Sequence, residues 1–291
     1  MKFPSIQAVA VDLAVFSPDA VVEALGAHPL WWAVFSAAVG ACMASFCGLL
    51  ADRLPHAAGW RLEPRQGVNL VTPSHCDRCG TRIGPLCLVP VLGWLFLRGR
   101  CAACGARVPW IYPAAEAAAA AASAALALHF GATAAGAMSQ VMLWGCMALA
   151  WIDWREAWLP ARIAAPMLVL GLLVSPFSPD PADRINGLAA AAGAMSAAML
   201  WIRWRHGALV SGGDIMFCAM GGAWLGLRPV GAFLVAAAVL HGAAHAALRL
   251  SGRRWEPPEQ GMREMMGDGS YAPMGPALAL GFLAVLWFVP A

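Results

Sequence analysis

The chain has 291 residues, of which 60% are hydrophobic and only 12% are charged. This apolar content exceeds what one soluble core could bury, so the composition excludes an ordinary water-soluble protein, a disordered chain and a coiled coil. The net charge of +3 is too small to indicate nucleic-acid binding, and no nucleic-acid partner is expected. A helical bundle in a bilayer remains, with membrane lipid as its expected partner.

Eight mostly apolar stretches are bounded by charged residues or by Pro and Gly clusters, and each is a candidate membrane-spanning helix. They are expected at residues 29–51, 112–130, 136–152, 160–177, 186–202, 212–227, 229–248 and 275–290. The weakest is 212–227, which is short and opens with Gly212, Gly213 and Asp214, so its first turn is expected to be irregular. The pattern predicts an all-α polytopic membrane protein with about eight transmembrane helices.

These stretches divide the chain into four parts. Residues 1–28 form an N-terminal segment in which Asp12 interrupts the apolar run, so a short surface helix is expected and not a signal peptide. The first span, 29–51, is followed by a small loop domain at 52–111, and residues 112–291 form a membrane domain of about seven helices. The connection 249–274 is interpreted as a linker.

Lysine and arginine are distributed unevenly between the two sides that eight alternating spans define. Of the 19 Lys and Arg residues, all but Lys2, Arg184 and Arg228 fall on the side that carries the 52–111 loop. Because positive charge accumulates in cytoplasmic loops, this side is predicted to be the cytoplasm. Both termini are then expected on the periplasmic side of the membrane.

Four of the nine cysteines form two C-x2-C pairs in the loop domain. They are Cys76, Cys79, Cys101 and Cys104. Gly80 and Gly105 follow the two pairs and permit tight turns, and four thiolates in this pattern suit tetrahedral Zn²⁺. A redox pair or unmetallated thiols are the alternatives, although a cytoplasmic location disfavours disulfides. A zinc ion with four protein ligands would fold the loop without taking part in catalysis.

The remaining cysteines carry no predicted function. Those in apolar stretches are interpreted as small buried apolar residues. They are Cys42, Cys47, Cys146 and Cys218. Cys87, between the two pairs, is interpreted as a spare thiol.

Three acidic residues lie at predicted span ends, where a carboxylate is costly unless it faces a polar cavity. They are Glu116, Asp153 and Asp214. Asp153 ends the third span and Asp214 opens the sixth, so both lie at a similar predicted depth on the cytoplasmic side and could meet across the bundle. Two carboxylates sharing a proton suit acid–base hydrolysis. A proton or ion relay, or structural charges at helix ends, remain open at this point.

The motifs along nearly the whole chain resemble the type IV prepilin peptidases, the bifunctional leader peptidase and N-methyltransferase family. They are Ser45-Phe46, Arg53-Leu54-Pro55, Pro73-Ser74-His75-Cys76 with the double CxxC loop, Leu97-Arg98-Gly99-Arg100-Cys101, Tyr112-Pro113 with Glu116, Ile152-Asp153 with Leu159-Pro160, Gly213-Asp214 with Gly222-Ala223-Trp224-Leu225-Gly226, and Gly275-Pro276. Their order and spacing make the resemblance specific.

The resemblance implies an aspartic endopeptidase of the GxGD type, with Asp153 and Asp214 as the catalytic pair and Gly212 and Gly213 as substrate- or cofactor-binding residues beside them. The implied substrates are prepilins and pseudopilins of type IV pili and type II secretion, cut on the cytoplasmic side of the bacterial inner membrane after a short basic leader. The resemblance also implies N-methylation of the new N-terminal residue with S-adenosylmethionine. The cysteine loop and its junction with the bundle, including Glu116, are the expected place for that second site.

Four residues near the predicted sites depart from the family pattern, although both aspartates are retained. They are Gly48, Ala161, Ser211 and Met216.

Two rival interpretations of the chain remain. One is a proton-coupled transporter that uses the aspartates with His241 and His245, which lie on one helical face; no inverted repeat of interrupted spans supports it. The other is a non-catalytic membrane scaffold.

Overall fold

The computed structural model describes residues 28–61, 69–206, 211–253, 255 and 272–290. Within these ranges the eight predicted apolar stretches all form helices, and no β-strand is present. The helices are α2 (Pro29–Ala57), α4 (Ile111–Phe130), α5 (Ala134–Glu156), α6 (Ala161–Val174), α7 (Pro181–His206), α8 (Gly212–Leu225), α9 (Leu227–Leu250) and α11 (Gly275–Leu286). The expected N-terminal surface helix and most of the expected linker lie outside the described residues.

Five of these helices are long and apolar enough to cross a membrane, judged by length and composition. They are α2, α4, α5, α7 and α9, while α6 and α11 are shorter apolar helices. A small loop domain stands between α2 and α4, with one 3-10 turn, η2 (Pro85–Leu88), and one short helix, α3 (Leu92–Phe96). The prediction of an all-α polytopic membrane protein with a loop domain after its first span is confirmed.

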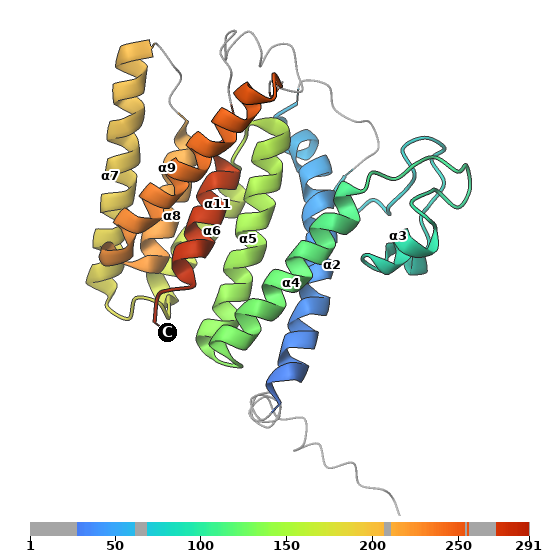
Figure 1. Ribbon diagram of the computed structural model, residues 1–291, viewed down its shortest axis with the longest axis horizontal. Helices are drawn as coiled ribbons and strands as arrows, with labels where there is room; N and C mark the ends of the chain where they lie inside the picture. The colour runs from blue at the N-terminus through green and yellow to red at the C-terminus, as the bar shows by residue number, and fades with distance from the viewer. Residues whose placement is uncertain (1–27, 62–68, 207–210, 254, 256–271, 291) are drawn as a thin grey trace, which may run out of the picture.

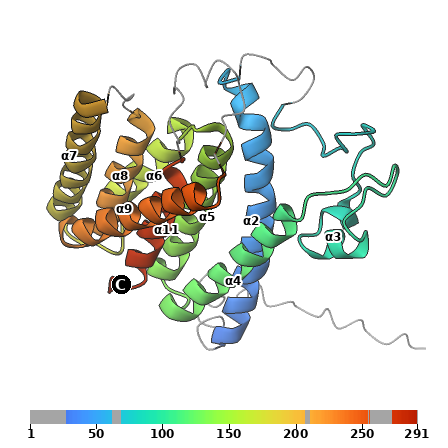
Figure 2. The same ribbon diagram turned by 45° about the horizontal axis from the view of Figure 1, so that its top comes forward.

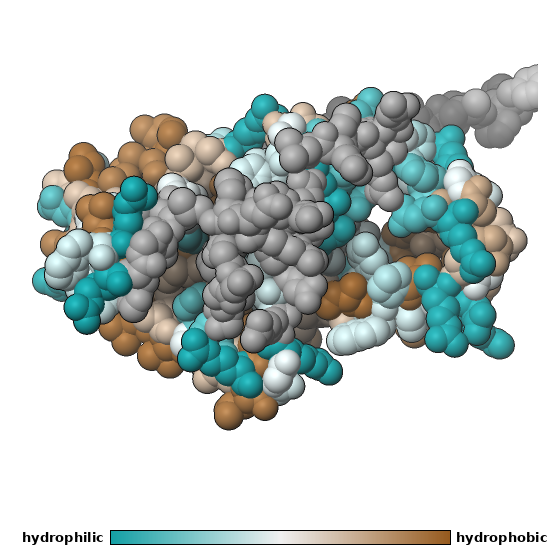
Figure 3. Space-filling view, turned by 90° about the horizontal axis from the view of Figure 1, so that it is seen from above, coloured by the Kyte–Doolittle hydropathy of each residue, from teal (hydrophilic) through white to brown (hydrophobic). Residues whose placement is uncertain are grey.

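The helices form one bundle with the loop domain attached to its side. Helices α2 and α4 pack together at one edge, α7 lies at the opposite edge, and α5, α6, α8 and α11 fill the space between them (Figures 1 and 2). The loop domain projects beyond α4, away from the rest of the bundle (Figure 1). Seen from above, hydrophobic side chains surround the α7 edge, and many hydrophilic ones gather over the loop domain (Figure 3).

The short helix α8 is enclosed by its neighbours, which explains how a 14-residue helix can lie within the bundle. Trp224 near its end is fully buried, and its indole Nε1 donates to the carbonyl of Met167 in α6 at 2.8 Å. The Ser175 hydroxyl donates to the Trp224 carbonyl at 2.6 Å. Because protein and not lipid surrounds it, α8 needs neither the length nor the uniform apolar surface of an isolated span.

Helix α2 continues past the predicted boundary at residue 51 to Ala57. The predicted end relied on the charges of Asp52 and Arg53, but both are accommodated within the helix. Arg155 Nη2 of α5 lies 3.4 Å from Asp52 Oδ1. The buried Arg53 guanidinium donates to the main-chain carbonyls of Asn69, at 3.1 Å, and Thr72, so it ties the loop domain to α2.

A buried ion pair joins the segment after α2 to the end of α5. Glu156 has 0% of its surface exposed, and its carboxylate accepts two hydrogen bonds from the Arg61 guanidinium, at 2.9 and 2.5 Å. The Trp60 indole donates to the Glu156 carbonyl at 3.3 Å and stacks on Trp158 with ring centroids 5.2 Å apart. The bidentate geometry holds the root of the loop domain against the last turn of α5.

Replacing Arg61 with Met should strongly destabilise the protein, because it removes the guanidinium that compensates the buried Glu156 carboxylate. We expect a loss of about 3–5 kcal/mol of unfolding free energy, measured by denaturant unfolding in detergent. The matched control is Arg155→Met, whose partly exposed pair with Asp52 should contribute no more than about 1 kcal/mol. Equal losses in the two variants would contradict a special role for the buried pair.

The opposite end of the bundle contains another buried arginine, Arg184 at the start of α7. It is 7% exposed, and its guanidinium donates to five main-chain carbonyls at and after the end of α6. The acceptors are the carbonyls of Leu172, Leu173, Ser175, Ser178 and Pro179. Leu172 and Leu173 lie in the last turn of α6, where carbonyls lack partners within the helix, and the other three acceptors lie between α6 and α7. Arg184 therefore caps α6 and is not a solvated loop charge.

Candidate functional site

Asp153 and Asp214 come together at the end of the bundle where the loop domain is attached. Asp153 lies in the last turn of α5 and Asp214 in the first turn of α8, with 3% and 4% of their surfaces exposed. Their carboxyl groups are near enough for direct electrostatic repulsion when both are charged. The structure therefore brings the two predicted aspartates into one buried pair, which we call the aspartate pair.

Helix α11 begins directly against this pair. The Gly275 N–H donates to Asp153 Oδ2 at 2.6 Å. A Cβ atom at Gly275 would lie 2.7 Å from that oxygen and 2.8 Å from the Asp153 Cβ, so only glycine permits this approach. The positive end of the α11 dipole thus faces the carboxylate, and Gly275 positions Asp153.

Asp214 is held by a regular helix start and not by the irregular turn that the sequence predicted. Ser211 is the N-cap of α8, and its hydroxyl accepts the Asp214 N–H at 3.3 Å. Neither Gly212 nor Gly213 has a positive φ, so the expectation of an irregular first turn is wrong. The departure from the family pattern at Ser211 supplies the cap that makes this turn helical.

The two glycines before Asp214 differ in their surroundings. A Cβ atom at Gly213 would lie 2.7 Å from the Leu159 Cβ, so this glycine lets the Leu159-Pro160 segment pack on α8. A Cβ atom at Gly212 would meet no described atom within 4 Å. The expected close approach of another segment therefore occurs at Gly213.

Each C-x2-C pair in the loop domain forms a tight turn closed by a main-chain hydrogen bond. The Gly80 N–H donates to the Cys76 carbonyl at 2.8 Å, and the Gly105 N–H donates to the Cys101 carbonyl at 2.9 Å. Gly80 and Gly105 have φ values of +68° and +70°, a conformation that favours glycine. The predicted role of these two glycines is confirmed.

The four cysteine sulfurs of the two turns converge on one point. All four Sγ atoms lie within 4.8 Å of one another, with Cys76 and Cys104 3.8 Å apart and Cys79 and Cys101 4.0 Å apart. Four thiolates bound tetrahedrally at about 2.3 Å from a zinc ion would have sulfurs about 3.8 Å apart. This group, which we call the four-cysteine cluster, therefore fits a tetrahedral metal ion.

Local hydrogen bonds favour the thiolate form of two of these cysteines. The Thr81 hydroxyl lies 3.3 Å from the Cys79 sulfur, and hydrogen bonds with Thr81 lower the pKa of Cys79 to about 6. Main-chain hydrogen bonds from Cys104 and Ala103 lower the pKa of Cys101. Because the thiolate is the metal-binding form, both effects favour metal binding at Cys79 and Cys101, whereas hydrogen bonds with these two cysteines raise the pKa of Cys104.

The cysteines of the apolar helices largely agree with their predicted burial. Cys47, Cys146 and Cys218 are buried. Cys42 is exposed, so the prediction is wrong for this residue, because α2 lies at the edge of the bundle with one side uncovered.

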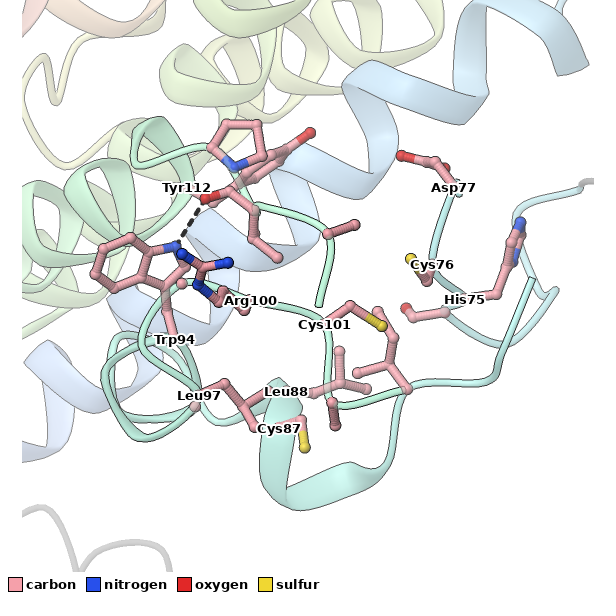
Figure 4. A pocket seen from close by; sticks show the side chains of 18 of the residues that line it. His75, Cys76, Asp77, Cys87, Leu88, Trp94, Leu97, Arg100, Cys101 and Tyr112 are labelled. Atoms are coloured by element: carbon pink, nitrogen blue, oxygen red, sulfur yellow. Dashed lines mark hydrogen bonds between the residues drawn. The ribbon is translucent and has the colours of Figure 1, made fainter. Parts of the chain in front are cut away.

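A cavity of about 460 Å³ lies between the four-cysteine cluster and helices α2 and α4. Trp94, Tyr112 and Arg100 gather on one side of it, and His75, Cys76 and Asp77 lie on the other (Figure 4). The Trp94 indole is fixed by donating to the Val108 carbonyl at 3.1 Å. The volume of the cavity and its mixture of aromatic, cationic and acidic groups are typical of a small-molecule site.

Glu116 forms part of the cavity wall and is not part of the aspartate pair. Its carboxylate is 8% exposed and accepts the Val91 N–H at 2.7 Å. This contact holds Val91 at φ +61°, a strained conformation for a β-branched residue. Neither Asp153 nor Asp214 lines the cavity, so the structure divides the predicted residues between two separate sites.

Three residues that support these sites were absent from the predicted site residues. They are Arg61, Glu156 and Gly275. Glu156 follows Asp153 by less than one helical turn, which is a weak local signal. Gly275 stands 122 positions from Asp153, so nothing in the local sequence could connect the two.

Comparisons with known proteins match two family models to the two halves of the chain. The bacterial peptidase A24 N-terminal domain matches residues 38–130, and the type IV leader peptidase family matches residues 140–246. The prepilin leader peptidase/N-methyltransferase of Pseudomonas aeruginosa is 32% identical, over 92% of this chain and 94% of the relative. The chain belongs to the type IV leader peptidase family.

Other relatives have the same name. The prepilin leader peptidase/N-methyltransferase of Pseudomonas putida is 32% identical over 90% of this chain and 93% of its own length, and that of Bacillus subtilis is 31% identical over 68% and 79%. No solved structure matches the chain significantly. The resemblance found in the motifs is thus confirmed, and the chain is a multi-pass membrane enzyme of this peptidase family.

The two family models divide the chain as the two sites do. The match at 38–130 contains Glu116 and the whole four-cysteine cluster, whereas the match at 140–246 contains both aspartates. Gly275 lies beyond either match, although it contacts Asp153 directly. Each site is therefore built mainly from the residues of one matched region.

Proposed function

We propose that this protein removes the short basic leader from type IV prepilins and pseudopilins and then N-methylates the new N-terminal residue. The observation that carries the peptidase half is the buried meeting of Asp153 and Asp214 from two helices at one end of the bundle. The activities for which the relatives are named supply the substrate class and the second activity.

In the proposed peptidase reaction the two aspartates act as a general base and a general acid. One carboxylate accepts a proton from a water molecule, whose oxygen attacks the scissile carbonyl carbon. The other carboxyl group donates its proton to the carbonyl oxygen, which gives a tetrahedral intermediate. Collapse of the intermediate breaks the C–N bond, the amine nitrogen takes up a proton, and the products are the leader carboxylate and the mature N-terminus.

The proposed orientation places the aspartate pair on the cytoplasmic side of the bacterial inner membrane. Arg53, Arg61 and Arg155 lie at this end of the bundle, in agreement with the concentration of positive charge in cytoplasmic loops. A prepilin has an apolar N-terminal helix after its basic leader, so its helix would lie in the bilayer while its cleavage site reached the interface. Both termini of the enzyme would then be periplasmic.

We propose that the four-cysteine cluster holds a structural Zn²⁺. The sulfur geometry fits four thiolate ligands, and four protein ligands leave no open position for substrate. The two halves of the cluster come from turns that are separate in sequence, so a shared metal ion would hold them together. Such an ion would shape the wall of the cavity beside it.

The cavity beside the four-cysteine cluster is the proposed site for S-adenosylmethionine, which supplies an electrophilic methyl group when bound. Trp94 and Tyr112 offer aromatic surfaces for an adenine ring, and Arg100 offers a cation for a carboxylate. Glu116 offers a negative charge beside the cationic sulfonium or the substrate amine. The chain's own residues would thus bind and orient the two reactants.

The proposed function is tested by incubating purified protein in lipid nanodiscs with a prepilin that retains its leader, with and without S-adenosylmethionine. Mass spectrometry of the product should show loss of the leader in both cases and one added methyl group only with S-adenosylmethionine. Glu116→Gln, which retains an oxygen acceptor for Val91, should lower methylation and leave cleavage intact. Absence of both activities in folded protein would favour the scaffold, and proton flux without cleavage would favour the transporter.

Replacing Gly275 with Ala should lower the cleavage rate without removing a catalytic group. The new Cβ would displace Asp153 or the start of α11, and a misplacement of about 1 Å can cost about 10²-fold in rate. The measurement is kcat for leader removal. Gly231→Ala in α9 is the control, because a Cβ atom there meets no atom of the described residues within 4 Å. A Gly275→Ala enzyme with an unchanged kcat would show that the contact with Asp153 is dispensable.

A further inference from the structure

The η2–α3 segment, residues 85–97, presents apolar side chains on its outer surface. Leu86, Leu92, Leu95 and Phe96 are exposed by 84%, 63%, 56% and 88%. These values match those of outward-facing residues on the membrane helices, such as Val235 at 64%. An apolar surface of this kind is unusual for a polar loop in water and indicates a contact partner.

The opposite face of the same segment is packed on the loop domain, so the segment is amphipathic. Gly93 is buried against the Cys87 carbonyl, and Trp94 and Leu97 line the cavity beside the four-cysteine cluster. The outer side chains are therefore held outward by a fixed core contact and cannot turn inward. We call the four outer residues, Leu86, Leu92, Leu95 and Phe96, the apolar rim.

The backbone of the segment is largely satisfied from within. The N–H groups of Cys87, Gly93 and Leu95 donate to carbonyls of the segment or its neighbour Gly84, and Pro85 and Pro90 have no N–H to satisfy. The Val91 N–H donates to Glu116. A segment with few unpaired main-chain donors can enter the edge of a bilayer at low cost.

The charges around the apolar rim suit an anionic surface. Residues 69–110 contain one acidic residue, Asp77, and five exposed arginines. They are Arg78, Arg82, Arg98, Arg100 and Arg107. Arg98 directly follows the segment, and an apolar surface on a cationic domain is the pattern of an interfacial membrane-binding element.

The position of α3 in the fold supports the same partner. Helix α3 lies beside α2 and α4 and not above the end of the bundle (Figures 1 and 2). Along the direction of α2, it lies closer to the middle of the bundle than the first turn of α4 does (Figure 1). The exposed Trp110 and Ile111 at the start of α4, 70% and 49% exposed, are typical of a membrane–water interface. A bilayer around α4 would therefore reach the apolar rim.

We propose that the apolar rim inserts into the edge of the bilayer that the helices span, with the adjoining Arg98 at anionic lipid headgroups. The loop domain then rests on the membrane surface as well as on α2 and α4. This contact would hold the cavity at a constant height beside the interface. The proposal concerns membrane contact and does not depend on either proposed enzymatic activity.

The test is photocrosslinking in nanodiscs made of phosphatidylethanolamine and phosphatidylglycerol. Phe96 or Leu86 is replaced with p-benzoylphenylalanine, and lipid adducts are quantified by mass spectrometry after irradiation. The matched control is Val71, which is 87% exposed in the same domain. It stands next to Thr72, whose carbonyl accepts a hydrogen bond from Arg53 of α2. The lipid-facing reference is Val235. We expect acyl-chain adducts at positions 86 and 96 at several-fold higher yield than at position 71.

Three results would overturn the proposal. The rim would be shown to stay in water if position 235 forms lipid adducts but positions 86 and 96 form them no more often than position 71. Crosslinks to a second copy of the enzyme would assign the rim to a dimer interface. Crosslinks to added prepilin, in place of lipid, would assign it to substrate docking.

Discussion

Replacing either Asp153 or Asp214 with Asn should abolish leader cleavage while leaving methylation of an already cleaved substrate intact. Asn is isosteric with Asp and can still accept the Gly275 N–H, so the helix packing at position 153 should persist. It can neither take a proton from water nor give one to the scissile carbonyl, and loss of such acid–base catalysis typically costs about 10²–10⁴-fold in rate. The measurement is the rate of leader loss followed by mass spectrometry.

Asp180→Asn provides the matched control for this experiment. Asp180 is exposed at the other end of the bundle, where its side chain accepts the Ala182 N–H, a role that Asn can also fill. This variant should cleave and methylate like the wild type. Cleavage by Asp214→Asn at the wild-type rate would refute the paired-aspartate mechanism, and simultaneous loss of methylation would show that the two sites are not separable.

The positions of the helices could be predicted because a membrane imposes a simple requirement on the sequence. A helix exposed to lipid must be apolar over its length, so α2, α5 and α9 stand out from hydropathy and flanking charge alone. The end of α2 could not be predicted in this way. Its last turns carry Asp52 and Arg53, whose charges are compensated by groups distant along the chain.

The meeting of the two aspartates could also be predicted from the sequence. Charges at similar predicted depth in two spans must be either solvated or gathered, and the positive-inside pattern placed both at one side. The surroundings of the pair were not within reach. The contact of Gly275 with Asp153 depends on how α11 packs against α5, which no local pattern encodes.

The first turn of α8 shows why a correct motif can give a wrong local expectation. Two consecutive glycines permit many backbone conformations, which suggested an irregular turn. In the structure the side chain of Ser211 satisfies the Asp214 N–H, and the helix begins at Gly212. The departure from the family pattern at position 211 is therefore compatible with a well-positioned carboxylate.

Loss of the Zn²⁺ that we propose for the four-cysteine cluster should unfold the loop domain and abolish methylation while leaving the aspartate pair in place. The described part of the loop domain has only one 3-10 turn and one short helix, so its order depends on the two cysteine turns. Structural zinc contributes about 10–16 kcal/mol to the folding of small zinc domains. Cys76→Ser should therefore lower bound zinc and raise hydrogen exchange across residues 74–108.

Cys87→Ser is the matched control, because Cys87 lies in the same domain but outside the four-cysteine cluster. It should retain zinc and low hydrogen exchange, which are the two readouts that this variant controls. Cleavage should remain measurable in Cys76→Ser, because α5 and α8, which carry the aspartates, each pack on α11 and not on the cysteine turns. Full methylation by zinc-free protein would refute the proposed structural role of the metal. Loss of cleavage together with methylation would mean that the ion pair of Arg61 and Glu156 transmits the disorder of the loop domain to α5.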